Sequence, residues 1–116
     1  MRDKITCKAD VITCASPNMH ALQKNKEYIK QPEDAIRRRN NEVMRRRIEF
    51  IRDVMETEDV EIAILGAYGG GVFRQDPEMG ATPFKQVLTD SNMECVYAVK
   101  PGFHMENVEA FRKIFA

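Results

Sequence analysis

Gly66-Ala-Tyr-Gly-Gly-Gly-Val-Phe-Arg-Gln-Asp-Pro77 is the stretch that decides the fold of this sequence. Residues 60–65 before it are almost continuously apolar, which is typical of a strand buried in a parallel sheet. Its four glycines allow positive φ and let a ligand approach without a Cβ in the way. Successive N–H groups can then point into one concavity that suits a phosphate. We therefore predict a phosphate-binding loop, with a tight strand-to-helix connection as the alternative.

Working outward, short apolar runs alternate with helical patterns along the whole chain, which we interpret as a single domain over residues 1–116. We predict strands at 9–15, 60–65 and 94–100, and helices from Glu33 or Asp34 to about 58, from Pro77 or Pro83 to about 90, and over 106–115. This order predicts an α/β fold with a mostly parallel sheet, right-handed crossovers and covering helices.

Each predicted helix carries apolar residues at helical spacing, which should face a common core. The expected core positions are Ile36, Val43, Met44, Ile48, Ile51, Val54, Met55, Phe84, Val87, Leu88, Val108, Phe111, Ile114 and Phe115.

Composition restricts the function classes. Lys+Arg and Asp+Glu both number 18, so we expect no general attraction to nucleic acid or to an anionic membrane. No segment approaches the roughly 20 apolar residues of a membrane span, and no signal-peptide pattern follows the N-terminus. The three cysteines lack disulfide or zinc spacing, which indicates reduced thiols and a cytoplasmic location.

Two arginine triplets, 37–39 and 45–47, resemble a nucleic-acid-binding pattern. Acidic residues such as Glu33, Glu42 and Glu49 stand at i,i+4 spacing in the same helix. We therefore favour an ion-paired, solvated helix face.

Ligands of open α/β sheets bind outside the carboxyl ends of the strands. Three segments follow predicted strands there, at 16–18, 66–76 and 100–104. His20 and His104 have no further ligands in view, so we expect no metal site, no cofactor and no catalytic constellation.

Two motifs in this sequence resemble the microbial-type poly(ADP-ribose) glycohydrolases, which are relatives of the macrodomains. They are Val11-Ile-Thr-Cys-Ala-Ser-Pro-Asn18, and Ile64-Leu-Gly-Ala-Tyr-Gly-Gly-Gly-Val-Phe-Arg-Gln-Asp-Pro77 with Phe84 beyond it. Tyr68 stands where the family has tryptophan, and Gln75 where it has asparagine. The chain resembles only the C-terminal half of the catalytic domain in that family. The resemblance implies a three-layer, macrodomain-like fragment.

The resemblance also implies ADP-ribose or an ADP-ribosylated protein as the ligand. The implied contact residues are Asn18, Gly66, Ala67, Tyr68, Gly69, Gly70, Gly71, Val72, Phe73 and Phe103. The catalytic signature of the family, Gly-Gly-Gly followed by Gln-Glu-Glu, is missing because this sequence contains no Glu-Glu. Gly69-Gly-Gly71 follows the wrong strand to replace it.

We therefore expect an ADP-ribose-binding protein without catalytic residues of its own. The alternatives are a glycohydrolase that works with another chain or a nonstandard acid/base, and a structural module that binds no nucleotide. A sheet of three strands has exposed edges, so we also expect self-association or a partner chain.

Overall fold

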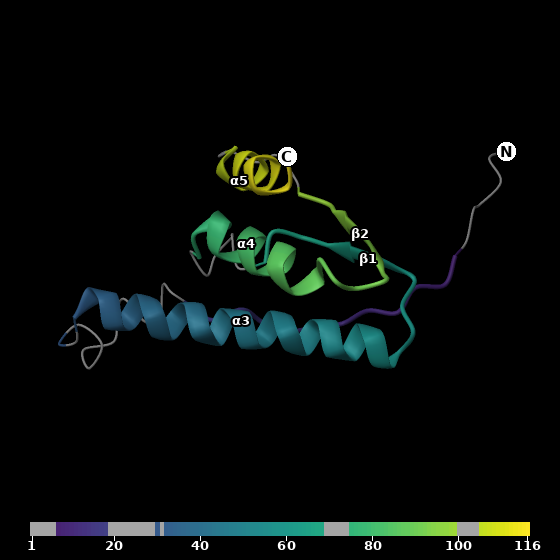
Figure 1. Ribbon diagram of the computed structural model, residues 1–116, viewed down its shortest axis with the longest axis horizontal. Coiled ribbons are helices and arrows are strands. Elements are labelled where there is room, and N and C mark those ends of the chain that lie inside the picture. The colour runs from purple at the N-terminus through teal and green to yellow at the C-terminus, as the bar shows by residue number, and fades with distance from the viewer. Residues whose placement is uncertain (1–6, 19–29, 31, 69–74, 100–104) are drawn as a thin grey trace, which may run out of the picture.

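The computed structural model describes residues 7–18, 30, 32–68, 75–99 and 105–116. Its elements are α3 (Glu33–Thr57), β1 (Ile62–Leu65), α4 (Pro77–Leu88), β2 (Glu94–Tyr97) and α5 (Glu106–Phe115) (Figure 1). β1 and β2 are parallel, with Ile62 beside Glu94 and Leu65 beside Tyr97. The predicted mixture of helices with a parallel sheet is confirmed.

The two faces of this sheet differ in what covers them. Ala63, Leu65, Cys95 and Tyr97 share one face and belong to a core to which all three helices contribute. Its largest fully buried side chains are Phe84 of α4 together with Met44 and Ile48 of α3. The opposite face carries the exposed apolar side chains Ile62, Ile64 and Val96. The described helices therefore cover one face only, and the three-layer arrangement is not confirmed.

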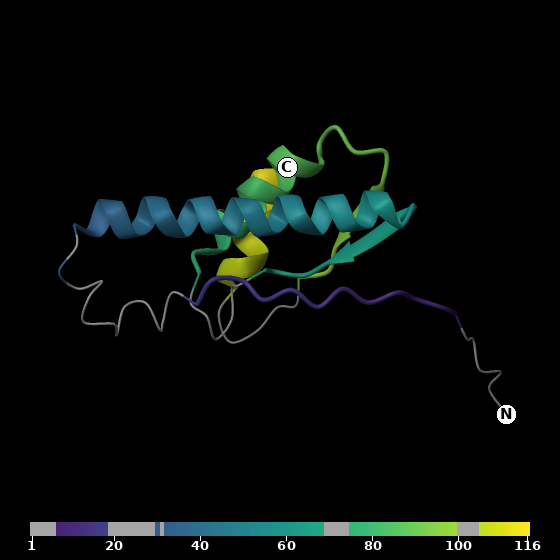
Figure 2. The same ribbon diagram turned by 90° about the horizontal axis from the view of Figure 1, so that it is seen from below.

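The prediction of a strand at 9–15 is wrong. Residues 7–18 run in the same direction as β1, as Figure 2 shows, but they have no strand structure. Backbone hydrogen bonds join β1 only to β2 among the described residues. Val11 is 84% exposed, so the apolar run that suggested a buried strand is not buried. Side chains of other segments hold this segment by its end instead, through Cys14, Ala15 and Pro17.

The end of α3 directs the chain into β1. Asp59 has a φ of 53°, in the left-handed region that commonly ends helices. Its N–H donates to the carbonyl of Glu56, and the N–H of Val60 donates to that of Met55. This pair of bonds has the pattern of a Schellman motif.

Of the two predicted starts for the next helix, the one at Pro77 is confirmed. Asp76 is the N-cap, and its side chain accepts a hydrogen bond from the N–H of Glu78 at 3.0 Å. Pro83 lies inside α4. The predicted strand at 94–100 is shorter in the structure, because β2 ends at Tyr97.

Candidate functional site

Residues 66–68 leave the carboxyl end of β1 in a tight turn. The N–H of Tyr68 donates to the carbonyl of Gly66 at 3.0 Å, with Ala67 between them. A Cβ added to Gly66 would meet no heavy atom within 4 Å, so the space beside it is open. The predicted ligand residues 69–73 and Phe103 lie outside the described residues and stay predictions.

Tyr68 is turned partly into the core. Its ring meets that of Phe84 edge-on, with centroids 6.0 Å apart, and its hydroxyl makes a hydrogen bond with the Cys14 thiol at 3.5 Å. Burial raises the pKa of Tyr68 well above its usual value; the Cys14 thiol adds to this rise and Arg47 opposes it in part. Tyr68 is therefore a neutral phenol that anchors the turn to the first segment.

A buried amide pair closes the far end of the glycine-rich segment. The amide groups of Asn40 and Gln75 donate to each other's carbonyl oxygens at 2.8 and 2.9 Å. Gln75 also donates to the backbone carbonyl of Pro17 at 2.6 Å. Both amides are 4% exposed, so each bond is made away from water. Three segments distant in sequence are thereby fixed together.

Asn41, next to Asn40, contributes an unused acceptor. Its Oδ1 is buried and has no hydrogen-bond partner within the described part of the chain. An unsatisfied buried acceptor costs about 1–3 kcal/mol.

Arg47 connects α3 to the segment that carries Asn18. Its Nη1 donates to the carbonyl of Ala15 at 2.8 Å, while Ser16 is buried beside it. Asn18 follows the buried Pro17 directly and is half-buried itself. Of the predicted ligand residues, the structure thus brings Asn18 and the turn at 66–68 to the same edge of the sheet.

An acidic hollow of about 470 Å³ lies between the first turns of α4 and α5. Asp76, Glu78, Glu106 and Glu109 line it with a single lysine, Lys113. The Lys113 ammonium is 3.0 Å from a carboxylate oxygen of Glu78, so its charge is already matched. This side of the edge disfavours an anion.

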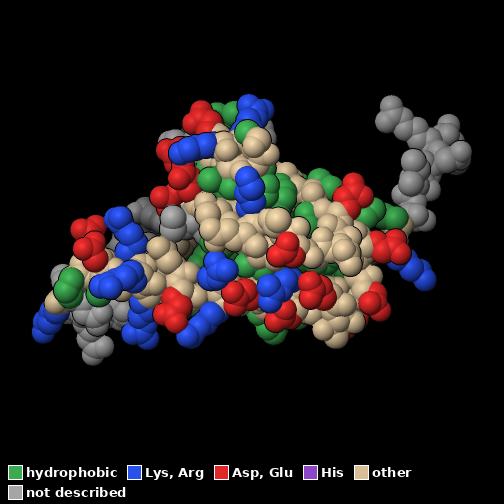
Figure 3. Space-filling view, viewed as in Figure 1, with side chains coloured by type: hydrophobic (Ala, Val, Ile, Leu, Met, Phe, Trp, Pro, Cys, Tyr) green, Lys and Arg blue, Asp and Glu red, His purple; other side chains and the backbone are tan. Residues whose placement is uncertain are grey.

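The opposite side of the edge is basic. Lys and Arg side chains gather over the N-terminal half of α3 in the space-filling view (Figure 3). The predicted ion pairs are confirmed for Arg37 with Glu33, Arg45 with Glu49 and Arg46 with Glu42.

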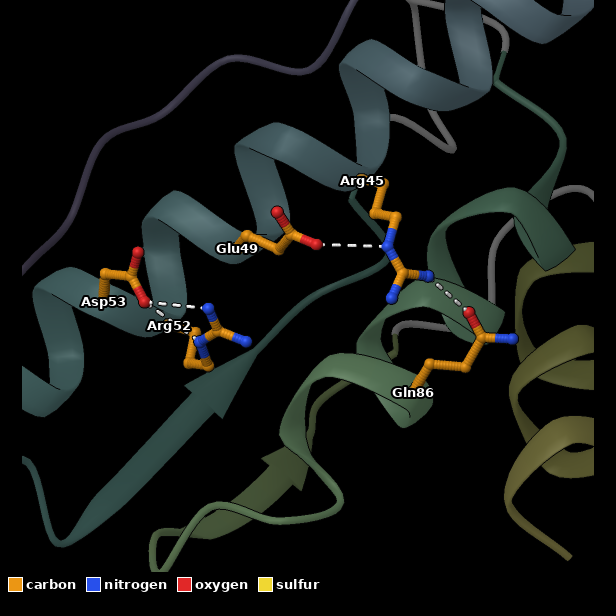
Figure 4. Close-up of polar contacts among 5 residues, drawn as sticks. All are labelled: Arg45, Glu49, Arg52, Asp53 and Gln86. Atoms are coloured by element: carbon orange, nitrogen blue, oxygen red, sulfur yellow. Dashed lines mark hydrogen bonds and ion pairs between the residues drawn. The ribbon is translucent and has the colours of Figure 1, made fainter.

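Arg45 reaches further than its helix. It contacts Glu49 in α3 at 3.1 Å and donates to Oε1 of Gln86 in α4 at 2.8 Å (Figure 4). This contact joins the two helices at their surface.

Within the described ranges, no group of His, Cys, Asp and Glu is arranged to hold a metal ion. The helices described are all too short or too polar to cross a membrane. Cys7, Cys14 and Cys95 are free thiols, and burial raises the pKa of Cys95. Both histidines lie outside the described residues.

The predicted edge segment 66–76 contains Gln75, but Asn40 and Arg47 were not predicted to lie at this edge. One signal was available for Asn40, because it stands four residues before Met44 and continues the apolar stripe of α3. An amide at a core position has to find a buried partner.

Comparisons with protein-family models, with curated proteins and with solved structures find no match to this chain.

Proposed function

We propose that this chain binds ADP-ribose at the carboxyl edge of its sheet, as a macrodomain-like protein related to the microbial-type poly(ADP-ribose) glycohydrolases. The observation that carries the proposal is the double role of Gln75. It follows the glycine-rich segment directly and bonds both Asn40 and the carbonyl of Pro17. Asn18 and Gly66, two residues that the resemblance assigns to the ligand, lie in segments tied to this edge.

The chemistry of the edge supports an anionic, hydroxyl-bearing ligand. A glycine-rich segment offers backbone N–H groups to a diphosphate, and the basic half of α3 adds a favourable field. The acidic hollow near Glu106 directs the diphosphate to the α3 side of the edge.

We propose that the chain binds ADP-ribose but does not hydrolyse it. Cleavage of a glycosidic bond needs a group that protonates the leaving oxygen or activates water. Two carboxylates described near the edge are already engaged, because Asp76 caps α4 and Glu78 contacts Lys113. The paired glutamates of the resembling family are missing from the sequence.

Isothermal titration calorimetry with ADP-ribose tests the proposal, with ribose 5-phosphate as a probe that lacks the diphosphate. We expect heat from ADP-ribose and at least about tenfold weaker binding of ribose 5-phosphate. Gly66→Val should weaken ADP-ribose binding by a similar factor, because its side chain enters the open space at the turn.

Ala98→Val is the matched control. Ala98 is exposed just beyond β2, and its N–H donates to the carbonyl of Leu65. The added methyl groups should leave ADP-ribose binding unchanged, with both variants folded by circular dichroism. Absence of heat with the folded wild-type chain would reject ADP-ribose binding and favour a structural module.

A further inference from the structure

Charge is divided along α3 and the turn after it, although the whole chain is neutral. Residues 33–47 contain six arginines and three carboxylates, whereas residues 48–61 contain six carboxylates and one arginine. In Figure 3, basic side chains gather over the N-terminal half of α3 and acidic ones predominate toward the other end. We call these surfaces the basic end and the acidic end.

The acidic end lies where the strands begin. Six exposed carboxylates at this end take part in none of the ion pairs described for the chain. They are Glu56, Glu58, Asp59, Glu61, Asp90 and Glu94. An open hollow of about 580 Å³ lies among four of them.

The helix dipole makes carboxylates at the C-terminal end of α3 unfavourable. The C-terminal end of a helix carries partial negative charge and is stabilised by cations. The last turn of α3 has no basic residue and includes Glu56. No described cation of the chain compensates this negative charge. A positively charged surface of another molecule would therefore be stabilised by it.

The two ends act independently in solution. Arg38 and Glu58 are separated by roughly 30 Å of helix at 1.5 Å per residue. The Debye length is about 8 Å at physiological ionic strength. The zero net charge therefore does not cancel the field at either end.

We propose that the acidic end binds the basic end of a second copy of this chain. The chain itself supplies the partner surface, which is the half of α3 with arginines at 37–39 and 45–47. Its side-chain ion pairs are exposed, and they leave an excess of positive charge. The two surfaces differ, so the contact is head-to-tail and generates open chains of copies rather than a closed dimer.

Sedimentation velocity of the full chain in about 20 mM and about 500 mM NaCl tests this contact. We expect reversible, concentration-dependent association at low salt that weakens at least about tenfold at high salt. Association that resists salt would contradict a charge-driven contact.

Two charge-reversal variants test the contribution of each end to association separately. Arg37→Glu with Arg38→Glu changes the basic end, and Glu56→Lys with Glu58→Lys changes the acidic end. Each variant alone should associate much more weakly than the wild type at low salt, because one of its two ends has lost most of the charge that attracts the other. An equimolar mixture should associate again, since the unchanged acidic end of one variant can bind the unchanged basic end of the other.

The control reverses two carboxylates away from both ends, Glu106→Lys with Glu109→Lys on α5. It changes the net charge as the acidic-end variant does and should still associate. A monomeric wild-type chain at low salt, or a mixture that stays monomeric while both variants are folded, would overturn the proposal. Binding of the acidic end only to an unrelated basic peptide would overturn it as well.

Discussion

The two ends of the β1–β2 sheet are held in different ways. At the carboxyl edge, buried amides of Asn40 and Gln75 fix the chain around Pro17, and Arg47 holds Ala15. At the other end, where the strands begin, one helix-ending turn at Asp59 leads into β1 among carboxylates that take part in none of the described ion pairs. The first end is specified by short-range polar contacts and the second is open to its surroundings. A buried network suits a preformed site, and uncompensated charge suits a partner.

The largest effect is expected from breaking the carboxyl edge at Gln75. Gln75→Ala should destabilise the fold by about 2–3 kcal/mol, because it leaves buried groups of Asn40 and Pro17 unsatisfied. Urea denaturation measures the loss. Gln86→Ala is the control. Gln86 is an exposed glutamine that makes a side-chain hydrogen bond as well, with Arg45, yet its loss should cost less than about 0.5 kcal/mol of stability. Equal effects of the two changes would show that the amide pair contributes nothing special.

At the other end, the backbone of Asp59 sharpens the comparison. Asp59→Gly should stabilise the chain by about 1 kcal/mol, because glycine adopts the left-handed conformation without a Cβ penalty. Thermal unfolding measures the gain. Asp59→Asn removes the same charge but keeps the Cβ, so it should give the smaller gain. If the glycine variant is less stable than the wild type, the assigned role of the turn is incorrect.

Single charges at the two ends of α3 should have opposite effects. Glu56→Gln should stabilise by about 0.3–1 kcal/mol, since a carboxylate opposes the dipole in the last turn. Glu33→Gln should destabilise by about 0.3–1 kcal/mol, since Glu33 lies in the first turn. Chemical denaturation at low ionic strength measures both, and urea is preferred because it adds no salt. The same sign for both changes would contradict the division of charge along the helix.

The smallest effect concerns Tyr97 and should be absent at neutral pH. Burial raises the pKa of Tyr97 to about 12, with Cys95 as a lesser cause. The unfolded chain loses this proton at lower pH than the folded chain, so stability should fall as pH rises from the ordinary tyrosine value toward 12. Tyr97→Phe should reduce this alkaline loss. Urea denaturation across that pH range measures the stability of both proteins. If the stability of the Tyr97→Phe variant declines as much as that of the wild type, Tyr97 titrates like an exposed tyrosine.

The sequence predicted the helices and two of the strands because their signals are local. The spacing of Met44, Ile48 and Ile51 identifies the buried face of α3, and Asp76 followed by proline marks the start of α4. The prediction at 9–15 failed because apolar content alone does not supply a hydrogen-bonded neighbour. Asn40 and Gln75 are 35 residues apart, so only the folded chain reveals that they meet.

The proposed ligand edge is tested most directly by the backbone amide spectrum of ¹⁵N-labelled protein during titration with ADP-ribose. We predict shifts that saturate at the amides of Asn18, Ala67, Tyr68 and Gln75, with no change at Glu58. Shifts confined to the end around Glu58, or no shifts at all in the folded chain, would contradict a nucleotide site at the carboxyl edge.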